Sequence, residues 1–115
     1  MKKKLLSALL VATCVVSMAA CGSNKTEKEA KDDKIIVGTE AGFAPYEYMK
    51  GNEVVGIDMD IAKAIADDMG KELEIKNMDF DGALAAVASG KVDFVAAGVS
   101  IDEDRLKTMD FSHEY

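Results

Sequence analysis

The sequence predicts an α/β fold with a mostly parallel sheet, and two observations support this. Between residues 34 and 115, short apolar runs alternate with segments of helical periodicity, the order typical of βαβ units. The runs at 34–39 and 92–98 are rich in apolar and β-branched residues, as expected of buried strands. A chain of 115 residues favours one folded domain.

The first elements are expected to be a strand, a loop and a hairpin. Residues 34–39 contain a β-branched run and predict the first strand. Residues 40–46 contain a glycine and the only proline of the chain, so they predict a loop. The segments 47–49 and 53–55 flank Lys-Gly-Asn, and together they predict a β-hairpin.

A first helix is expected next, with Asp58 as its N-cap and Gly70 after its last turn. Apolar residues recur at helical spacing along it and predict the face that packs on the sheet. These are Ile57, Ile61, Ile65 and Met69, with Ala62 and Ala66 beside them.

A strand at 72–76 and a second helix at 82–89 follow. Either Asp79 or Asp81 can cap this helix, because both precede it closely. Alternation in 72–76 indicates a half-exposed strand. These elements continue the alternating order of an α/β fold.

The last part of the chain predicts a strand, a short helix and a further strand. Residues 92–98 predict the second buried strand. Asp102 can cap a short helix that runs through Lys107. Residues 109–112 predict the start of another strand.

Residues 1–20 have the pattern of a secretory signal peptide. Three lysines precede an apolar run over 5–20, which is shorter than the roughly 18–20 residues that span a bilayer. Small residues lead into Cys21, which resembles the acylated cysteine of bacterial lipoproteins. A secreted protein without lipid, or an uncleaved anchor, is the alternative. Residues 21–33 are then the lipidated cysteine and a polar, disordered tether.

Charge and composition exclude several classes of partner. The formal charge is −7, and removal of the signal peptide would make the chain more acidic. Nucleic acid and anionic membrane surfaces are therefore poor partners, and the lipid would be the only link to the membrane. Cys14 lies inside the expected signal peptide and Cys21 is the expected acylation site, so neither is left to form a disulfide. His113 is the only histidine. We expect no disulfide, no metal site and no cofactor.

Strand 92–98 leads into a candidate anion site. Gly98 and Ser100 precede the expected helix start, where free N–H groups favour an anion. A cation in the first helical turn opposes the dipole, so Arg105 is unusual there. Arg105 either pairs on the surface with an acid such as Glu103 or Asp104, or holds a ligand carboxylate with its guanidinium fork.

Two aromatic residues and one acid complete the candidates. Phe43 lies in the loop after the first strand, and Phe80 lies at the start of the second helix. Loops after parallel strands are where open α/β sheets bind ligands, although either ring could instead pack in the core. Glu40 could accept a hydrogen bond from a ligand amine, or it could be merely exposed.

A series of motifs across 34–115 resembles the polar-amino-acid binding proteins of ABC importers, in the extracellular solute-binding protein family 3. The motifs are Ile-Ile-Val-Gly-Thr, Gly-Phe-Ala-Pro-Tyr-Glu-Tyr, Gly-Ile-Asp-Met-Asp-Ile-Ala, Met-Asp-Phe, Gly-Lys-Val-Asp, Gly-Val-Ser-Ile-Asp-Glu-Asp-Arg and Met-Asp-Phe-Ser. The resemblance implies the type II periplasmic-binding-protein fold, in which two α/β sandwich lobes close on an amino acid. The chain would hold part of the first lobe, so it is expected to be an amino-terminal fragment.

The resemblance also implies roles for single residues. Phe43 and Phe80 would pack on the ligand, Gly98 and Ser100 would cradle it, and Arg105 would hold its α-carboxylate. Glu40 matches an acid that touches the ligand in some members. The family's usual Thr-Pro-Glu is Asp-Glu-Asp at 102–104 here, which adds negative charge near a carboxylate site.

The implied function is binding of a free polar amino acid outside the cytoplasm and its delivery to ABC permease subunits. The protein would be held to the outer face of the cell membrane by its lipid and would not be an enzyme. An enzyme of the same fold, similar to cyclohexadienyl or arogenate dehydratase, is one alternative. A sensor input domain or a truncated lobe with little function are the others.

Overall fold

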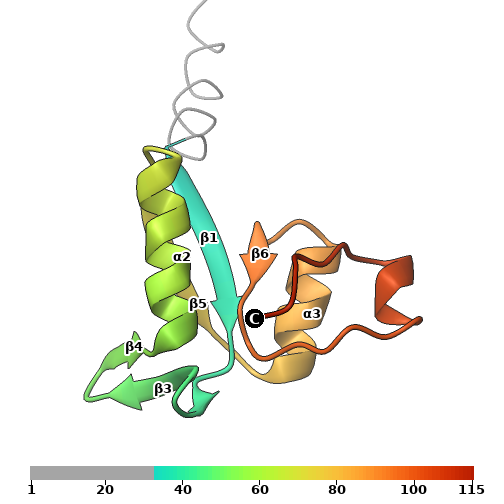
Figure 1. The fold of residues 1–115 in the computed structure, drawn as a ribbon, viewed down its shortest axis with the longest axis horizontal. Coiled ribbons are helices and arrows are strands. Elements are labelled where there is room, and N and C mark those ends of the chain that lie inside the picture. The colour runs from blue at the N-terminus through green and yellow to red at the C-terminus, as the bar shows by residue number, and fades with distance from the viewer. Residues whose placement is uncertain (1–32) are drawn as a thin grey trace, which may run out of the picture. The chain divides into compact units, whose positions relative to one another are not determined.

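A computed structural model describes residues 33–115 of the protein (Figure 1). The expected signal peptide, Cys21 and nearly all of the tether lie outside the described residues. The described residues, 33–115, lie in one compact unit. Its core is small and built around Val37, Met59, Ala62 and Ala96.

The main sheet has three parallel strands, as the sequence predicts. β1 (Lys34–Thr39) lies between β5 (Glu72–Asn77) and β6 (Phe94–Val95). β5 pairs with β1 along its full length, whereas β6 pairs through two residues only. The strand expected over 92–98 is therefore shorter in the structure, although Asp93 N and Ala96 N on either side of β6 still donate to carbonyl oxygens of β1.

A second, antiparallel sheet lies at the carboxyl end of β1 (Figure 1). β3 (Glu47–Lys50) and β4 (Glu53–Val55) form the hairpin that the sequence predicts. β2 (Gly42–Phe43) adds a third strand by pairing with β3, inside the segment expected to be a loop. Two residues are too short a run for periodicity to reveal.

Helix α2 (Ile57–Asp68) is present, but Asp58 is not its N-cap. Gly56 occupies that position and offers no side chain. The first amides of α2 instead donate to carbonyl oxygens of the preceding loop, Ile57 N to Pro45 O at 3.1 Å and Asp58 N to Tyr46 O at 2.9 Å. Carbonyl oxygens of the loop therefore accept from the free N–H groups at the start of α2, in place of a side-chain cap.

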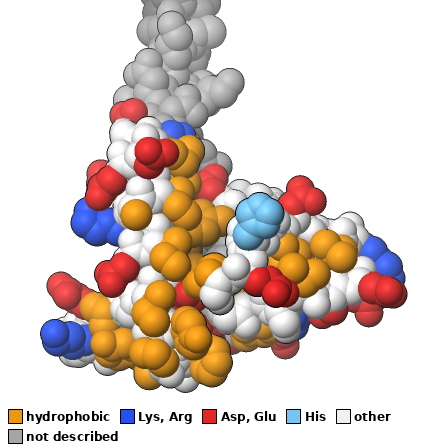
Figure 2. Space-filling model, viewed as in Figure 1, with side chains coloured by type: hydrophobic (Ala, Val, Ile, Leu, Met, Phe, Trp, Pro, Cys, Tyr) orange, Lys and Arg blue, Asp and Glu red, His pale blue; other side chains and the backbone are white. Residues whose placement is uncertain are grey.

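The buried face of α2 also differs from the expected one. Its buried residues are Asp58, Met59, Ala62 and Ala66. Most of the isoleucine stripe is exposed, with Ile57 44% and Met69 51% accessible. Alanines allow the helix to approach the sheet closely, so Ala62 and Ala66, together with Met59, face it in place of the isoleucines. Figure 2 shows apolar side chains running along α2 and gathered over the β3–β4 hairpin.

The remaining elements follow the expected order with one exception. α3 (Phe80–Ala88) is capped by Asp79, whose carboxylate accepts from Gly82 N at 2.9 Å. The short helix is the 3₁₀ turn η1 (Arg105–Lys107). Residues 109–112 form no strand in the structure, because no described strand pairs with them. No helix within 33–115 is both long and apolar enough to cross a bilayer.

Candidate functional site

The carboxyl ends of the three parallel strands are tied into one edge. The Thr39 hydroxyl donates to the Ala96 carbonyl oxygen at 2.6 Å, and Met78 N donates to Thr39 O at 2.9 Å. The Asn77 side chain accepts from Ala41 N at 3.0 Å. The segments that follow β1, β5 and β6 therefore begin side by side, at the edge where open α/β sheets bind ligands.

Phe43 and Gly98 meet at this edge. Phe43 is 52% exposed, and its ring stacks on Tyr46 with centroids 5.4 Å apart. A Cβ atom at Gly98 would lie 3.0 Å from two carbons of the Phe43 ring, and the φ of Gly98 is +59°. Only glycine fits both the conformation and the space. The exposed ring is thus held as an aromatic surface and is not packed in the core.

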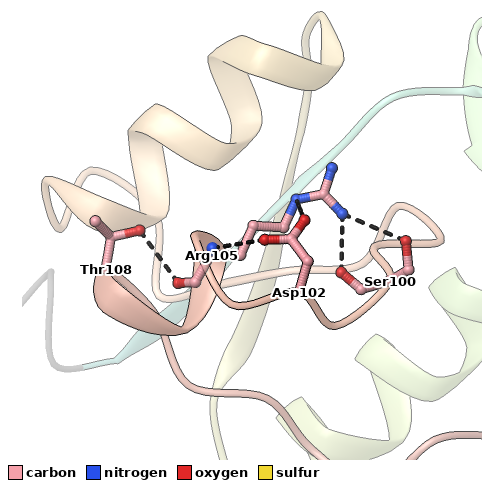
Figure 3. A network of polar contacts seen from close by, with 4 residues as sticks. All are labelled: Ser100, Asp102, Arg105 and Thr108. Atoms are coloured by element: carbon pink, nitrogen blue, oxygen red, sulfur yellow. Dashed lines mark hydrogen bonds and ion pairs between the residues drawn. The ribbon is translucent and has the colours of Figure 1, made fainter.

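Arg105, Ser100 and Phe80 form a second group on the same edge. Arg105 Nη1 donates to the Ser100 carbonyl oxygen at 2.8 Å and lies 3.4 Å from its hydroxyl (Figure 3). The guanidinium carbon lies 5.3 Å from the centroid of the Phe80 ring, within the range of a cation–π contact. Phe80 belongs to α3, so the contact ties α3 to the 98–105 segment.

Both readings of Arg105 find support in the contacts. Arg105 Nε lies 3.2 Å from Asp102 Oδ2, so the arginine does pair with a local acid. That acid is neither Glu103 nor Asp104, and Asp104 pairs with Lys107. Nη2 of the guanidinium donates to no acceptor among the described residues. Its side chain is 24% exposed, so one donor edge remains open to a ligand.

Asp102 holds the turn that presents Arg105. Its Oδ1 accepts from Arg105 N at 2.8 Å while its Oδ2 faces the guanidinium (Figure 3). The Asp102 carboxylate therefore accepts from the first amide of η1 and also orients the arginine side chain, although the N-cap position itself belongs to Asp104 and not to Asp102 as expected. The acid-rich 102–104 segment thus supports the cation and does not merely surround it with negative charge.

Glu40 is not joined to the other candidates by any contact. Its carboxylate folds back over its own loop, 2.7 Å from where a Cβ of Gly42 would be. Gly42 leaves the space that this carboxylate occupies. The structure therefore brings five of the six candidates into two neighbouring groups, Phe43 with Gly98 and Phe80 with Ser100 and Arg105, and leaves Glu40 apart.

Sequence reasoning missed two acids beneath this edge, Glu47 and Asp58. Their exposed fractions are 0% and 1%. Burial, contact with Asp58 and the charges of Asp58 and Glu40 together raise the pKa of Glu47 to about 8. A signal was present for Asp58, which precedes the buried Ala62 and Ala66 at four-residue spacing. For Glu47 there was none, because a hairpin residue is commonly exposed.

A groove of about 520 Å³ runs between α3 and the 102–109 segment. Arg105 lies in its lining, but Phe43, Gly98 and Ser100 do not. The groove therefore adjoins the edge described above through Arg105 but does not include the Phe43–Gly98 group. No cluster of three or more potential metal ligands occurs in residues 33–115.

Comparison with known proteins gives a consistent set of relatives. Residues 35–115 match the family described as bacterial extracellular solute-binding proteins, family 3. The arginine-binding extracellular protein ArtP of Bacillus subtilis is 42% identical over the whole of this chain, which covers 45% of that protein. The chain thus spans less than half the length of this relative.

Solved structures agree with this result. AbpA of Streptococcus pneumoniae, an amino acid ABC transporter substrate-binding protein bound to L-arginine, superposes with a TM-score of 0.72 at 44% identity, over 77% of this chain and 39% of that chain. Domain 1 of TmArgBP from T. maritima, in its arginine-bound form, gives a TM-score of 0.70 at 38% identity, over 77% and 71%. The partial α/β domain is therefore that of the periplasmic-binding-protein fold, and the chain belongs to the bacterial extracellular solute-binding proteins, family 3.

Proposed function

We propose that this chain binds a polar amino acid outside the cytoplasm, as part of a receptor that serves an ABC importer. The observation that supports this most directly is the Phe80–Ser100–Arg105 group at the carboxyl edge of the sheet. The relatives whose names state a ligand are amino-acid-binding proteins, several of them for arginine. Their role as binding proteins favours a receptor over an enzyme.

Each of the proposed contacts has a clear chemical role. The open Nη2 edge of Arg105 and the Ser100 hydroxyl can donate to an α-carboxylate, and charge-assisted hydrogen bonds of this kind are short and strong. The exposed face of Phe43 can stack on the ligand side chain, with cation–π attraction if that side chain is cationic. Glu40 would need to unfold from its loop to reach an amine.

Titration of the isotope-labelled chain with L-arginine, followed by NMR, tests this function. We expect shifts at Phe43, Phe80, Ser100 and Arg105. We also expect an affinity in about the millimolar range, near −4 kcal/mol, because one face of the ligand stays in water. Domain 1 of TmArgBP in its arginine-bound form is a precedent for binding by a single domain.

Agmatine, which is arginine without its α-carboxylate, is the matched control ligand. It should cause much smaller shifts at Ser100 and Arg105 than L-arginine does. Equal shifts with both compounds, or shifts confined to the groove beside α3, would contradict the proposed site. A panel of histidine, glutamine and glutamate then ranks the side chains that the site accepts.

We further propose that Cys21 carries a lipid that holds the protein on the outer face of the cell membrane. The position of Cys21 directly after the small residues of a signal peptide supports this. Cys21→Ser should abolish acylation, and the protein should then be released or remain unprocessed. Mass spectrometry of the mature N-terminus checks this, and a wild-type protein without acyl mass would refute it. Delivery of the ligand to permease subunits is part of the same proposal.

A further inference from the structure

Glu47 and Asp58 form a buried acid pair directly beneath the candidate site. When both carboxyls are taken as acceptors, the two oxygens of Glu47 have no hydrogen-bond partner among the described residues. Asp58 has a partner for one of its two oxygens. Asp58 Oδ1 accepts from the Tyr115 hydroxyl at 2.8 Å. Their backbones are adjacent, because Asp58 N donates to the carbonyl oxygen of Tyr46, the residue before Glu47, at 2.9 Å. Contact with Asp58 is, after burial, a cause of the raised pKa of Glu47. No lysine or arginine of residues 33–115 pairs with either of them.

Two buried carboxylates without a cation cannot both be charged at low cost. A proton on Glu47 resolves this, because its O–H then donates to Asp58 Oδ2, which otherwise has no donor. The groups that face the pair all favour this state. Asp58 and Glu40 add negative charge to Glu47, and burial with contact to Asp58 raises the pKa of Tyr115 to about 12, so its hydroxyl remains a donor.

The pair lies where five parts of the chain meet. Glu47 begins β3 and is the register partner of Phe43 in β2. Glu47 Oε1 lies 3.9 Å from the Cβ position of Gly98, which the Phe43 ring also contacts. Asp58 stands in the first turn of α2, and Tyr115 brings in the C-terminal segment. A change in the charge of the pair can therefore act on the Phe43 ring directly, because Glu47 is next to both Phe43 and Gly98.

We propose that Glu47 and Asp58 share one proton and that this protonated pair positions the Phe43 ring against Gly98. Both are positioning residues, since neither is placed to touch the ligand. The binding consequence rests on the proposed function, whereas the shared proton and the ring position do not. When the pair loses its proton, two like charges face each other in the interior, and the β2–β3 segment moves away from α2.

The sign of the pH dependence follows from the raised pKa of Glu47. A carboxyl protonated in the folded state and ionised in the unfolded state stabilises the fold at low pH, and this contribution is lost as the pH rises towards about 8. Glu47→Gln keeps a donor towards Asp58 and cannot titrate, so it should remove this dependence. Glu53→Gln, at an exposed carboxyl of the same hairpin, should leave it unchanged.

The test uses the purified full chain without ligand. Carbon-13 NMR of the glutamate carboxyls should show one group titrating near pH 8, absent in Glu47→Gln and present in Glu53→Gln. The ring-shifted Hα signals of Gly98 should lose their shift over the same pH range in wild type and keep it in Glu47→Gln. Wild-type data alone decide the matter if a variant does not fold. Glu47 titrating near its ordinary pKa, or Gly98 signals indifferent to pH, would overturn the proposal.

L-arginine adds a readout that separates this proposal from the proposed function. At about pH 9 only about one tenth of the Glu47 carboxyls would be protonated. The ratio of the wild-type affinity to the Glu47→Gln affinity should therefore be about tenfold lower at pH 9 than at pH 6. If arginine binds nowhere but Glu47 and Gly98 titrate as described, the proposed function fails and the positioning pair stands. If arginine binds with no difference in pH profile between the two proteins, the positioning role is wrong and the proposed function stands.

Discussion

Arg105→Ala should weaken L-arginine binding by about 2–3 kcal/mol, or roughly 30- to 150-fold, because charged hydrogen bonds contribute about this much. The loss arises at the open Nη2 edge of the guanidinium, which would meet the ligand carboxylate. Arg105→Lys should recover only part of it, since a lysine keeps the charge but not the planar fork. NMR titration gives the affinities.

Lys107→Ala is the matched control for Arg105→Ala. Lys107 is also a cation in η1, but its side chain is 71% exposed and pairs with Asp104. Its loss should leave affinity nearly unchanged. Agmatine should bind Arg105→Ala about as well as wild type, since it has no carboxylate to lose. An Arg105→Ala chain that binds L-arginine normally would leave Arg105 as the partner of Asp102 alone.

Gly56→Ala should destabilise the fold by about 3 kcal/mol or more, which approaches the whole stability of a small domain. Gly56 has φ +131° and ψ −177°, a region that only glycine occupies readily. An added Cβ would also lie 2.3 Å from the Tyr46 carbonyl oxygen. That oxygen accepts from Asp58 N, so relief of the clash would break the backbone cap of α2.

Gly51→Ala is the control for Gly56→Ala, because it tests the cost of a positive φ without a steric clash. Gly51 has φ +64° in the hairpin turn, but no atom lies within 4 Å of its Cβ position. Its substitution should cost only about 1 kcal/mol, the penalty for a left-handed residue. Urea denaturation followed by circular dichroism measures both variants. Similar midpoints for the two would show that the loop carbonyls can move away from residue 56 at little cost.

Local sequence signals predict most of the elements, because their causes are local. Asp79 caps α3 through a residue three positions away, and the Lys-Gly-Asn turn sets the hairpin. The errors have non-local causes. α2 turns its alanines inward because the sheet approaches closely, and β6 is limited to the two residues that form a ladder with β1. A single segment contains no information about either neighbour.

The site was predicted to a similar extent. Phe43, Gly98, Ser100 and Arg105 are candidates from the sequence because each lies at the end of an expected strand, follows one or begins an expected helix, and the structure places them at one edge. Their division into two groups could not be predicted, nor could the position of Glu40, since both depend on how loops fold over one another. The burial of Glu47 could not be predicted from its local sequence, because it results from packing against α2 and the segment around Gly98.

The central position of β1 has a consequence for the order in which the protein folds. β1 comes first in the chain, yet both of its partners come later, and its Thr39 bonds to Ala96, 57 positions away. Loop closure over such separations is slow compared with formation of the hairpin β3–β4. We therefore expect the hairpin to form early and the edge that joins three strand ends to form last. Binding competence would then mark the completion of folding, and an amino acid present in the medium would favour the fully formed state over its precursors.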